Sequence, residues 1–228
     1  MLFIFDLNGV LGHVQPKTTN SSSIRPSVSR EPDFIKDNYK VWHRPNLPLI
    51  TRNLLIKQRD NVNVGIWSSQ SRDHTEKQIE AMFGKTFAQL LFVFYTGNRE
   101  QLMNNYDENN VDPLPIKRDL EMVYDKYSFH NEENTVVISN HANIIEDYRT
   151  NEIIVPLFDP YLGTTNFLDD QHINYMSKYF TALFAMDNHS GEDVRAKINS
   201  MSYKKFAQKL TKRTNYDSYD ESKNVLGE

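Results

Sequence analysis

The chain has 228 residues, of which 39% are hydrophobic and 25% are charged, a composition typical of a globular protein with a sizeable core. It contains no cysteine, which excludes disulfide bonds, thiolate zinc sites and cysteine nucleophiles. The formal net charge of −4 gives the whole chain no attraction to nucleic acid or anionic membranes, and no stretch predicts membrane insertion.

Four apolar residues at the start of the chain, residues 2–5, run directly into Asp6. A short apolar run of this kind, followed by Gly9 and Gly12, predicts a buried strand of a parallel sheet. The run breaks at Asp6 and has no basic segment before it, so it does not resemble a secretion signal or a transit peptide. We therefore expect the protein in the cytoplasm or the nucleus.

Helical and strand-like segments alternate along the rest of the chain. Residues 16–32 are rich in Ser and Thr, contain several prolines and predict a loop, as do the polar residues 97–115. Apolar residues at helical spacing predict helices over 47–60, 74–90, 117–129, 169–186 and 194–213. Short apolar runs predict strands over 62–67, 91–96, 134–139 and 152–158.

This alternation predicts an α/β fold, with a doubly wound and mostly parallel sheet covered by helices on both faces. We predict one domain over residues 1–185, a basic helical extension over 186–214 and a polar tail over 215–228. Ser71 or Asp73 is the expected N-cap of the second helix. An aromatic stripe on the helix over 169–186 is expected in the core, and its members are Tyr175, Tyr179, Phe180 and Phe184.

Polar residues follow several of the predicted strands. Ligands of open α/β sheets bind beyond the carboxyl ends of the strands, so these residues are the candidates for a site. They are Asp6, Asn8, Ser68, Ser139 and Asn140. Lys117, at a predicted helix start, is the candidate cation.

A carboxylate, a hydroxyl, an amine and an amide at one edge of a sheet would make a phosphate site. The carboxylate of Asp6 is a potential nucleophile that would form an aspartyl-phosphate. The Ser68 hydroxyl and Lys117 would hold phosphoryl oxygens and offset their charge. Carboxylate and amide oxygens are hard ligands that would hold Mg²⁺.

The order of these motifs resembles the haloacid dehalogenase (HAD) superfamily. The segments "HRP", "VGIWSSQS" and "PLPIKRDLEMVYDKY", with "ENTVVIS" after them, resemble the FCP/SCP branch. This branch contains phosphatases of the RNA polymerase II carboxy-terminal domain and their relatives, among them a mitochondrial translocase subunit. The resemblance covers roughly residues 1–185, with the Ser-rich loop as an insertion.

The resemblance implies a HAD-like fold with a small β insertion over 94–115 and extra helices at the C-terminal end. It gives Asp6 the role of nucleophile and first metal ligand, and Ser68 and Lys117 the role of phosphate-binding residues. Asn140 would be a further metal ligand. Asn8 occupies the position of the family's general acid and base, and its backbone carbonyl would face Mg²⁺.

Two positions depart from the family's pattern. The amide of Asn8 cannot give or take a proton near neutral pH, and such catalysis typically contributes ~10²–10⁴-fold. Ser139 lacks the carboxylate that the family has there, which weakens the expected hold on Mg²⁺. The sequence therefore favours a phosphatase-like domain with impaired or absent catalysis, a pseudophosphatase that serves as a binding or assembly subunit of a larger complex.

Two alternatives remain. The first is an active Mg²⁺-dependent protein Ser/Thr phosphatase that uses Asp6 and acts on a phosphoprotein. The second is a structural subunit that binds RNA or an acidic protein partner through the basic residues of 195–213. The translocase relatives keep the mitochondrion open as a location.

Overall fold

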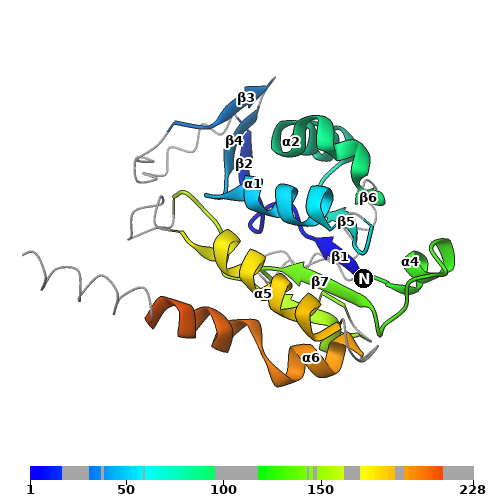
Figure 1. The fold of residues 1–228 in the computed structure, drawn as a ribbon. Coiled ribbons are helices and arrows are strands. Elements are labelled where there is room, and N and C mark those ends of the chain that lie inside the picture. The colour runs from blue at the N-terminus through cyan, green and yellow to red at the C-terminus, as the bar shows by residue number, and fades with distance from the viewer. Residues whose placement is uncertain are drawn as a thin grey trace, which may run out of the picture.

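The computed structural model describes residues 1–16, 31–36, 39–58, 60–95, 118–142, 144–145, 148–161, 170–187 and 193–212. Five parallel strands form the central sheet in the order β6-β5-β1-β7-β8 (Figure 1). They are β1 (Leu2–Phe5), β5 (Asn63–Ser68), β6 (Phe92–Tyr95), β7 (Thr135–Ser139) and β8 (Glu152–Ile154). The predicted α/β fold class and all five predicted strands are confirmed.

The first strand, β1, lies at the centre of the sheet, and all four of its residues are apolar and fully buried. Its Phe5 pairs with Ile66 of β5 on one side and with Ile138 of β7 on the other. A strand with neighbours on both sides and helices on both faces has no polar face, which explains its uninterrupted apolar sequence.

Helices cover both faces of this sheet. They are α1 (Leu47–Ile50) with its π-helical continuation (Thr51–Lys57), α2 (Arg72–Phe83), α4 (Glu121–Lys126), α5 (His172–Asp187) and α6 (Val194–Ser200). On one face, Phe3 packs in the larger core cluster with Phe180 of α5. On the other face, Ile4 packs in a second cluster with Val123 of α4. Alternate residues of β1 therefore supply two cores, one on each side.

A second, antiparallel sheet was not predicted from the sequence. It has the strand order β2-β4-β3 and is formed by β2 (Gly12–Pro16), β3 (Phe34–Lys36) and β4 (Tyr39–His43). At Gly12, a Cβ atom would lie 2.6 Å from the backbone oxygen of Trp42 in β4, so this close approach requires glycine. Residues 17–30 of the predicted Ser-rich loop and residues 96–115 of the predicted β insertion lie outside the described residues.

The predicted helices differ from the observed ones mainly at their ends. The second predicted helix is α2 followed by a 3₁₀ helix (Gly84–Gln89), and Ser71 is its N-cap residue without a side-chain cap hydrogen bond. The expected helix over 194–213 is wrong as one element, because α6 ends at Ser200 and a separate helix spans 203–212. Tyr203 at the start of that helix is buried in the larger core cluster, which also contains Phe3 and Phe5 of β1.

The aromatic stripe on α5 is confirmed as part of the core. Tyr179 and Phe180 are buried, and Tyr175 and Phe184 pack against the larger cluster. The Tyr179 hydroxyl donates to the Met201 carbonyl oxygen at 2.6 Å, at the break between α6 and the last described helix. Within the described ranges, no helix combines the length and apolar character needed to cross a membrane.

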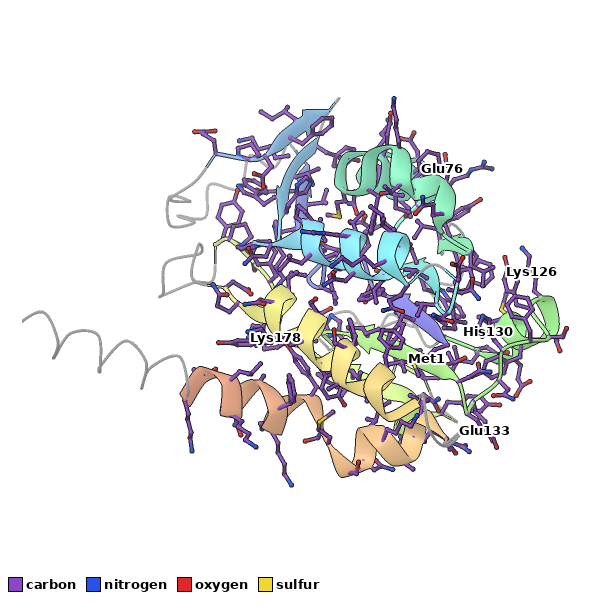
Figure 2. The ribbon with its side chains drawn as sticks, in the orientation of Figure 1. Met1, Glu76, Lys126, His130, Glu133 and Lys178 are labelled. Carbon is purple, nitrogen blue, oxygen red and sulfur yellow. The ribbon has the colours of Figure 1, made fainter. Side chains whose placement is uncertain are left out.

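The amino end of β1 is fixed by polar contacts. The Met1 amino group donates to the Asn61 carbonyl oxygen at 2.9 Å, and His130 lies close by (Figure 2). Burial lowers the pKa of His130, and the positive charge of the amino group acts in the same direction. His130 therefore stays neutral and hydrogen-bonds to Asn63 and Asn134, at 3.0 and 3.1 Å.

Candidate functional site

The candidate site is built around Asp6, the first residue after β1. Its backbone N–H continues the sheet by donating to the Ile138 carbonyl oxygen at 2.9 Å, which fixes where the side chain projects. Asp6 Oδ1 accepts a hydrogen bond from the Leu7 N–H at 2.9 Å. Asp6 Oδ2 lies 3.1 Å from Arg118 Nη2 in an ion pair with 9% and 5% side-chain exposure. Both oxygens of the carboxylate are thus engaged.

Arg118 reaches Asp6 from the segment before α4. Its backbone N–H donates to the Ile144 carbonyl oxygen at 2.7 Å, and its guanidinium carbon lies 5.9 Å from the ring centre of Trp67. Its Nη1 is buried and has no hydrogen-bond partner among the described residues. Arg118 therefore holds Asp6 with one nitrogen and keeps a second, oriented donor at the site.

The sequence analysis named Lys117 as the cation of the site, and Lys117 lies outside the described residues. Arg118, its neighbour, was missed. Lys117 and Arg118 are two adjacent basic residues at the start of a predicted helix, and neither composition nor hydrophobic periodicity distinguishes them. The ion pair with Asp6 identifies Arg118 as a cation of the candidate site.

Ser68 and Ser139 end the two strands on either side of β1. Ser68 lies two residues beyond Ile66, the partner of Phe5, and Ser139 follows Ile138. Both side chains are buried, at 1% and 0% exposure. Ser68 Oγ accepts from the Gln70 N–H at 3.1 Å, and Ser139 Oγ accepts from the His141 N–H at 3.0 Å. The register therefore brings both hydroxyls to the edge of the sheet where Asp6 lies.

Asn8 is part of the loop that joins the two sheets. Its Oδ1 accepts a hydrogen bond from the Val14 N–H at 3.1 Å, which ties its side chain to β2. The following Gly9 has φ of 81° and donates from its N–H to the Gly12 carbonyl oxygen at 2.7 Å. A positive φ at this tight turn favours glycine, so the turn fixes where Asn8 stands relative to Asp6.

Asn140 lies against the same loop. A Cβ atom on Gly9 would come within 3.1 Å of the Asn140 side chain and within 2.6 Å of the Leu157 side chain. Asn140 Oδ1 is buried and has no hydrogen-bond partner among the residues described. Leu157 is 50% exposed. The loop at Gly9 is therefore flanked by the unpaired amide oxygen of Asn140 and by the exposed side chain of Leu157.

Arg44 also holds the loop after β1 in place. The Arg44 side chain is buried, and its guanidinium contacts both carboxylate oxygens of Asp170 at 3.0–3.1 Å. Its Nη1 also donates to the Val10 carbonyl oxygen at 3.2 Å. Arg44 belongs to the "HRP" segment that the sequence analysis identified. Its partner Asp170 lies 126 positions away, so no local sequence pattern could predict the ion pair.

The donors around Asp6 do not make a good Mg²⁺ site. Mg²⁺ takes an octahedral set of oxygen ligands and usually draws its charge balance from carboxylates. Among the described residues, no group of three or more His, Asp or Glu side chains could hold a metal ion. The Asp6 carboxylate is shared with the Leu7 N–H and Arg118. The backbone carbonyl of Asn8 stays a predicted ligand, and Asn140 Oδ1 is a buried acceptor without a partner among the described residues.

Comparison with known proteins finds similar structures, but no match to a family model or to a curated sequence. The structure is similar to that of Fcp1, an essential RNA polymerase II CTD phosphatase, with a TM-score of 0.57 and 13% identity. That match covers 88% of this chain and 70% of the Fcp1 chain in that structure.

A second similar structure is that of a variant of the fission yeast RNA polymerase II CTD phosphatase Fcp1 bound to beryllium fluoride. Its TM-score is 0.45 at 12% identity, over 99% of this chain and 65% of that chain. At these identities the comparison shows the fold alone. The chain has the HAD-like α/β fold of Fcp1, a parallel five-stranded sheet with helices on both faces.

Proposed function

We propose that this chain is a phosphatase-like domain with impaired or absent catalysis, and that it serves as a binding or assembly subunit. The observation that carries the proposal is Asn8, which stands two residues after Asp6 and hydrogen-bonds to the Val14 N–H. An amide there can neither protonate a leaving oxygen nor activate water. The expected loss is ~10²–10⁴-fold in each step that needs a proton transfer.

The state of Asp6 supports the same conclusion. As a nucleophile, its carboxylate oxygen would have to attack phosphorus, yet one oxygen is held by the Leu7 N–H and the other by Arg118. Both contacts stabilise the negative charge of the carboxylate and so lower its nucleophilicity. This effect adds to the missing proton donor.

Binding of a phosphoryl group demands less than its hydrolysis. Arg118 Nη1 is a buried donor without a partner among the described residues, and the Ser68 hydroxyl lies at the same edge of the sheet. Charged donors of this kind bind phosphate oxygens strongly. We therefore propose Ser68 and Arg118, with Lys117 as the sequence predicts, as the phosphate-binding set for a phosphorylated protein partner.

The test is hydrolysis of an aryl phosphate and of a phosphoserine peptide in buffer with Mg²⁺. The wild-type protein and Asp6→Asn are expected to release phosphate at the same background rate, because the site lacks a group that can transfer protons. Asn8→Asp is measured as a restoration. Its matched control is Asn61→Asp, which makes the same charge change at the opposite end of β5, next to the start of that strand.

Hydrolysis by the wild-type protein that Asp6→Asn abolishes and Asn8→Asp does not raise would contradict the proposal. It would establish the alternative, an active Ser/Thr phosphatase with Asp6 as nucleophile. A gain in Asn8→Asp that Asn61→Asp does not share would support the proposal, because it would show that the amide blocks turnover. The proposed compartment stays the cytoplasm or the nucleus, with the mitochondrion as the alternative.

The basic residues of 195–213 favour a second candidate function, RNA binding. Fewer of these residues are available for phosphate contacts than the sequence predicted. Lys197 is buried, and Arg195 is paired with Glu132 and Asp193 at 3.0 and 2.5 Å. The helix over 203–212 contains no acidic residue, and its exposed lysines are Lys204, Lys205, Lys209 and Lys212. Among the described residues, these four lysines are the remaining candidates for phosphate contacts, and Arg213 of the predicted region lies outside the described residues.

Replacement of these four lysines with glutamine is expected to remove any salt-dependent binding of a single-stranded RNA oligonucleotide. Each phosphate neutralised contributes a slope of about −0.7 to log K against log salt, so four contacts give at most about −3. Fluorescence anisotropy at several salt concentrations measures the slope. Wild-type binding with no salt dependence, or an unchanged slope in the quadruple variant, would exclude this helix as an RNA site.

A further inference from the structure

We propose that the Arg118 guanidinium supplies, within this site, the positive charge that a divalent metal would otherwise supply to Asp6. The site would then be electrostatically complete without Mg²⁺, as a permanent internal ion pair. The inference concerns the same site as the proposed function, but it depends on the surroundings of Asp6 and not on the identity of a partner.

The first support is the burial of the pair. The Asp6 and Arg118 side chains are 9% and 5% exposed, and their charged atoms lie 3.1 Å apart. A buried carboxylate is costly unless it is paired and hydrogen-bonded. Asp6 meets both conditions through Arg118 and the Leu7 N–H, so neither of its oxygens needs a metal to offset desolvation.

The second support is how Arg118 is held. The Ile144 carbonyl oxygen accepts from its backbone N–H, and the Trp67 ring lies beside its guanidinium. These contacts come from two other parts of the sheet edge and fix the cation before any ligand arrives. A guanidinium stays charged at all ordinary pH values and pairs with a carboxylate in a defined geometry, which a flexible ammonium does not.

The third support is the chemistry of the neighbouring positions. Ser139 follows the adjacent strand β7 with a hydroxyl that already accepts from the His141 N–H. Asn8 Oδ1 accepts a hydrogen bond from the Val14 N–H. Beside the neutral Asn140 Oδ1, the Asp6 carboxylate is therefore the one anionic ligand that these positions offer. The guanidinium 3.1 Å from Asp6 Oδ2 would repel a divalent ion bound to the same carboxylate.

The experiment is thermal unfolding of the full chain in EDTA and in millimolar Mg²⁺, with calorimetric titration of Mg²⁺ as a second measurement. The wild-type Tm is expected to be the same in both buffers. Arg118→Gln and Asp6→Asn each leave a buried charge unpaired and are expected to lower Tm by roughly 10 °C. The double variant leaves neither charge and is expected to unfold at a higher temperature than either single variant.

Arg72→Gln is the matched control, because Arg72 forms an exposed ion pair with Glu76 and its loss is expected to leave Tm within about 2 °C. A wild-type Tm that rises with Mg²⁺, with the rise lost in Asp6→Asn, would overturn the inference. Additive losses in the double variant would also overturn it. If the variants fail to fold, the response of the wild-type protein to Mg²⁺ decides the question.

Different experimental results would overturn this inference and the proposed function. Mg²⁺ binding at Asp6 without turnover would overturn the inference and leave the proposed function intact. Asp6-dependent hydrolysis in EDTA would overturn the proposed function and leave the inference intact.

Discussion

Arg44→Ala is expected to lower the free energy of unfolding by about 3 kcal/mol, because it breaks a buried ion pair from one side. The Arg44 guanidinium contacts both oxygens of Asp170, whose side chain is 18% exposed, and donates to the Val10 carbonyl oxygen. The substitution leaves the Asp170 carboxylate partly buried without its cation. Urea denaturation followed by circular dichroism measures the change.

The control for Arg44→Ala is Arg72→Ala, in which the lost ion pair is exposed and the expected change is within about 0.5 kcal/mol. Arg44→Lys keeps the charge but cannot contact Asp170 with two nitrogens, so we expect it to recover only part of the loss. A loss below about 1 kcal/mol in Arg44→Ala would show that the network around Arg44 does not stabilise the loop after β1.

Phe3→Ala is expected to lower the free energy of unfolding by about 3–5 kcal/mol, because it leaves a cavity at the centre of the larger core cluster. Phe3 is fully buried in β1, and its ring centre lies 4.7 Å from that of Phe180 and 5.6 Å from that of Phe184. The substitution removes the ring contacts of Phe3 in β1 with Phe180 and Phe184 of α5. Chemical denaturation monitored by tyrosine and tryptophan fluorescence measures this loss.

The matched control is Phe87→Ala, because the Phe87 side chain is 50% exposed and its truncation opens no enclosed cavity. We expect less than about 1 kcal/mol for this variant. Equal losses in Phe3→Ala and Phe87→Ala would contradict the assignment of Phe3 to the centre of the core.

The strands could be predicted from sequence because they are buried on both faces. Such strands are continuous apolar runs, and the runs over 2–5 and 134–139 match β1 and β7 to within one residue. The small sheet of β2, β3 and β4 could not be predicted in this way. Its strands are short and half-buried, and the sheet depends on the close approach of Gly12 to the Trp42 backbone, which only the folded structure shows.

The site could be predicted in part for a related reason. Residues that follow parallel strands collect at one edge, so the positions of Asp6, Ser68 and Ser139 follow from the strand predictions. Arg118 and Arg44 reach this region from segments outside the strands, and no local pattern indicates their partners. The ion pairs that set the electrostatics of the site are therefore the part that sequence periodicity did not reveal.

The segment over 194–212 shows how tertiary packing can override the hydrophobic periodicity of the sequence. Apolar residues continue at helical spacing through 194–213, which predicts one helix. The structure divides this segment at Met201 and Ser202, where the Met201 carbonyl oxygen accepts from the Tyr179 hydroxyl instead of continuing the helix. Tyr203 then enters the core and hydrogen-bonds to His172, whose pKa is lowered by burial and by the charge of Arg44.

The central place of β1 has a consequence for biosynthesis. Leu2 pairs with Asn63 and with Thr135, so β1 pairs with two strands that are translated much later. Contacts between residues so distant in sequence form slowly. Until β5 and β7 pair with it, the apolar β1 stays exposed, and such a strand promotes aggregation of an incompletely folded chain.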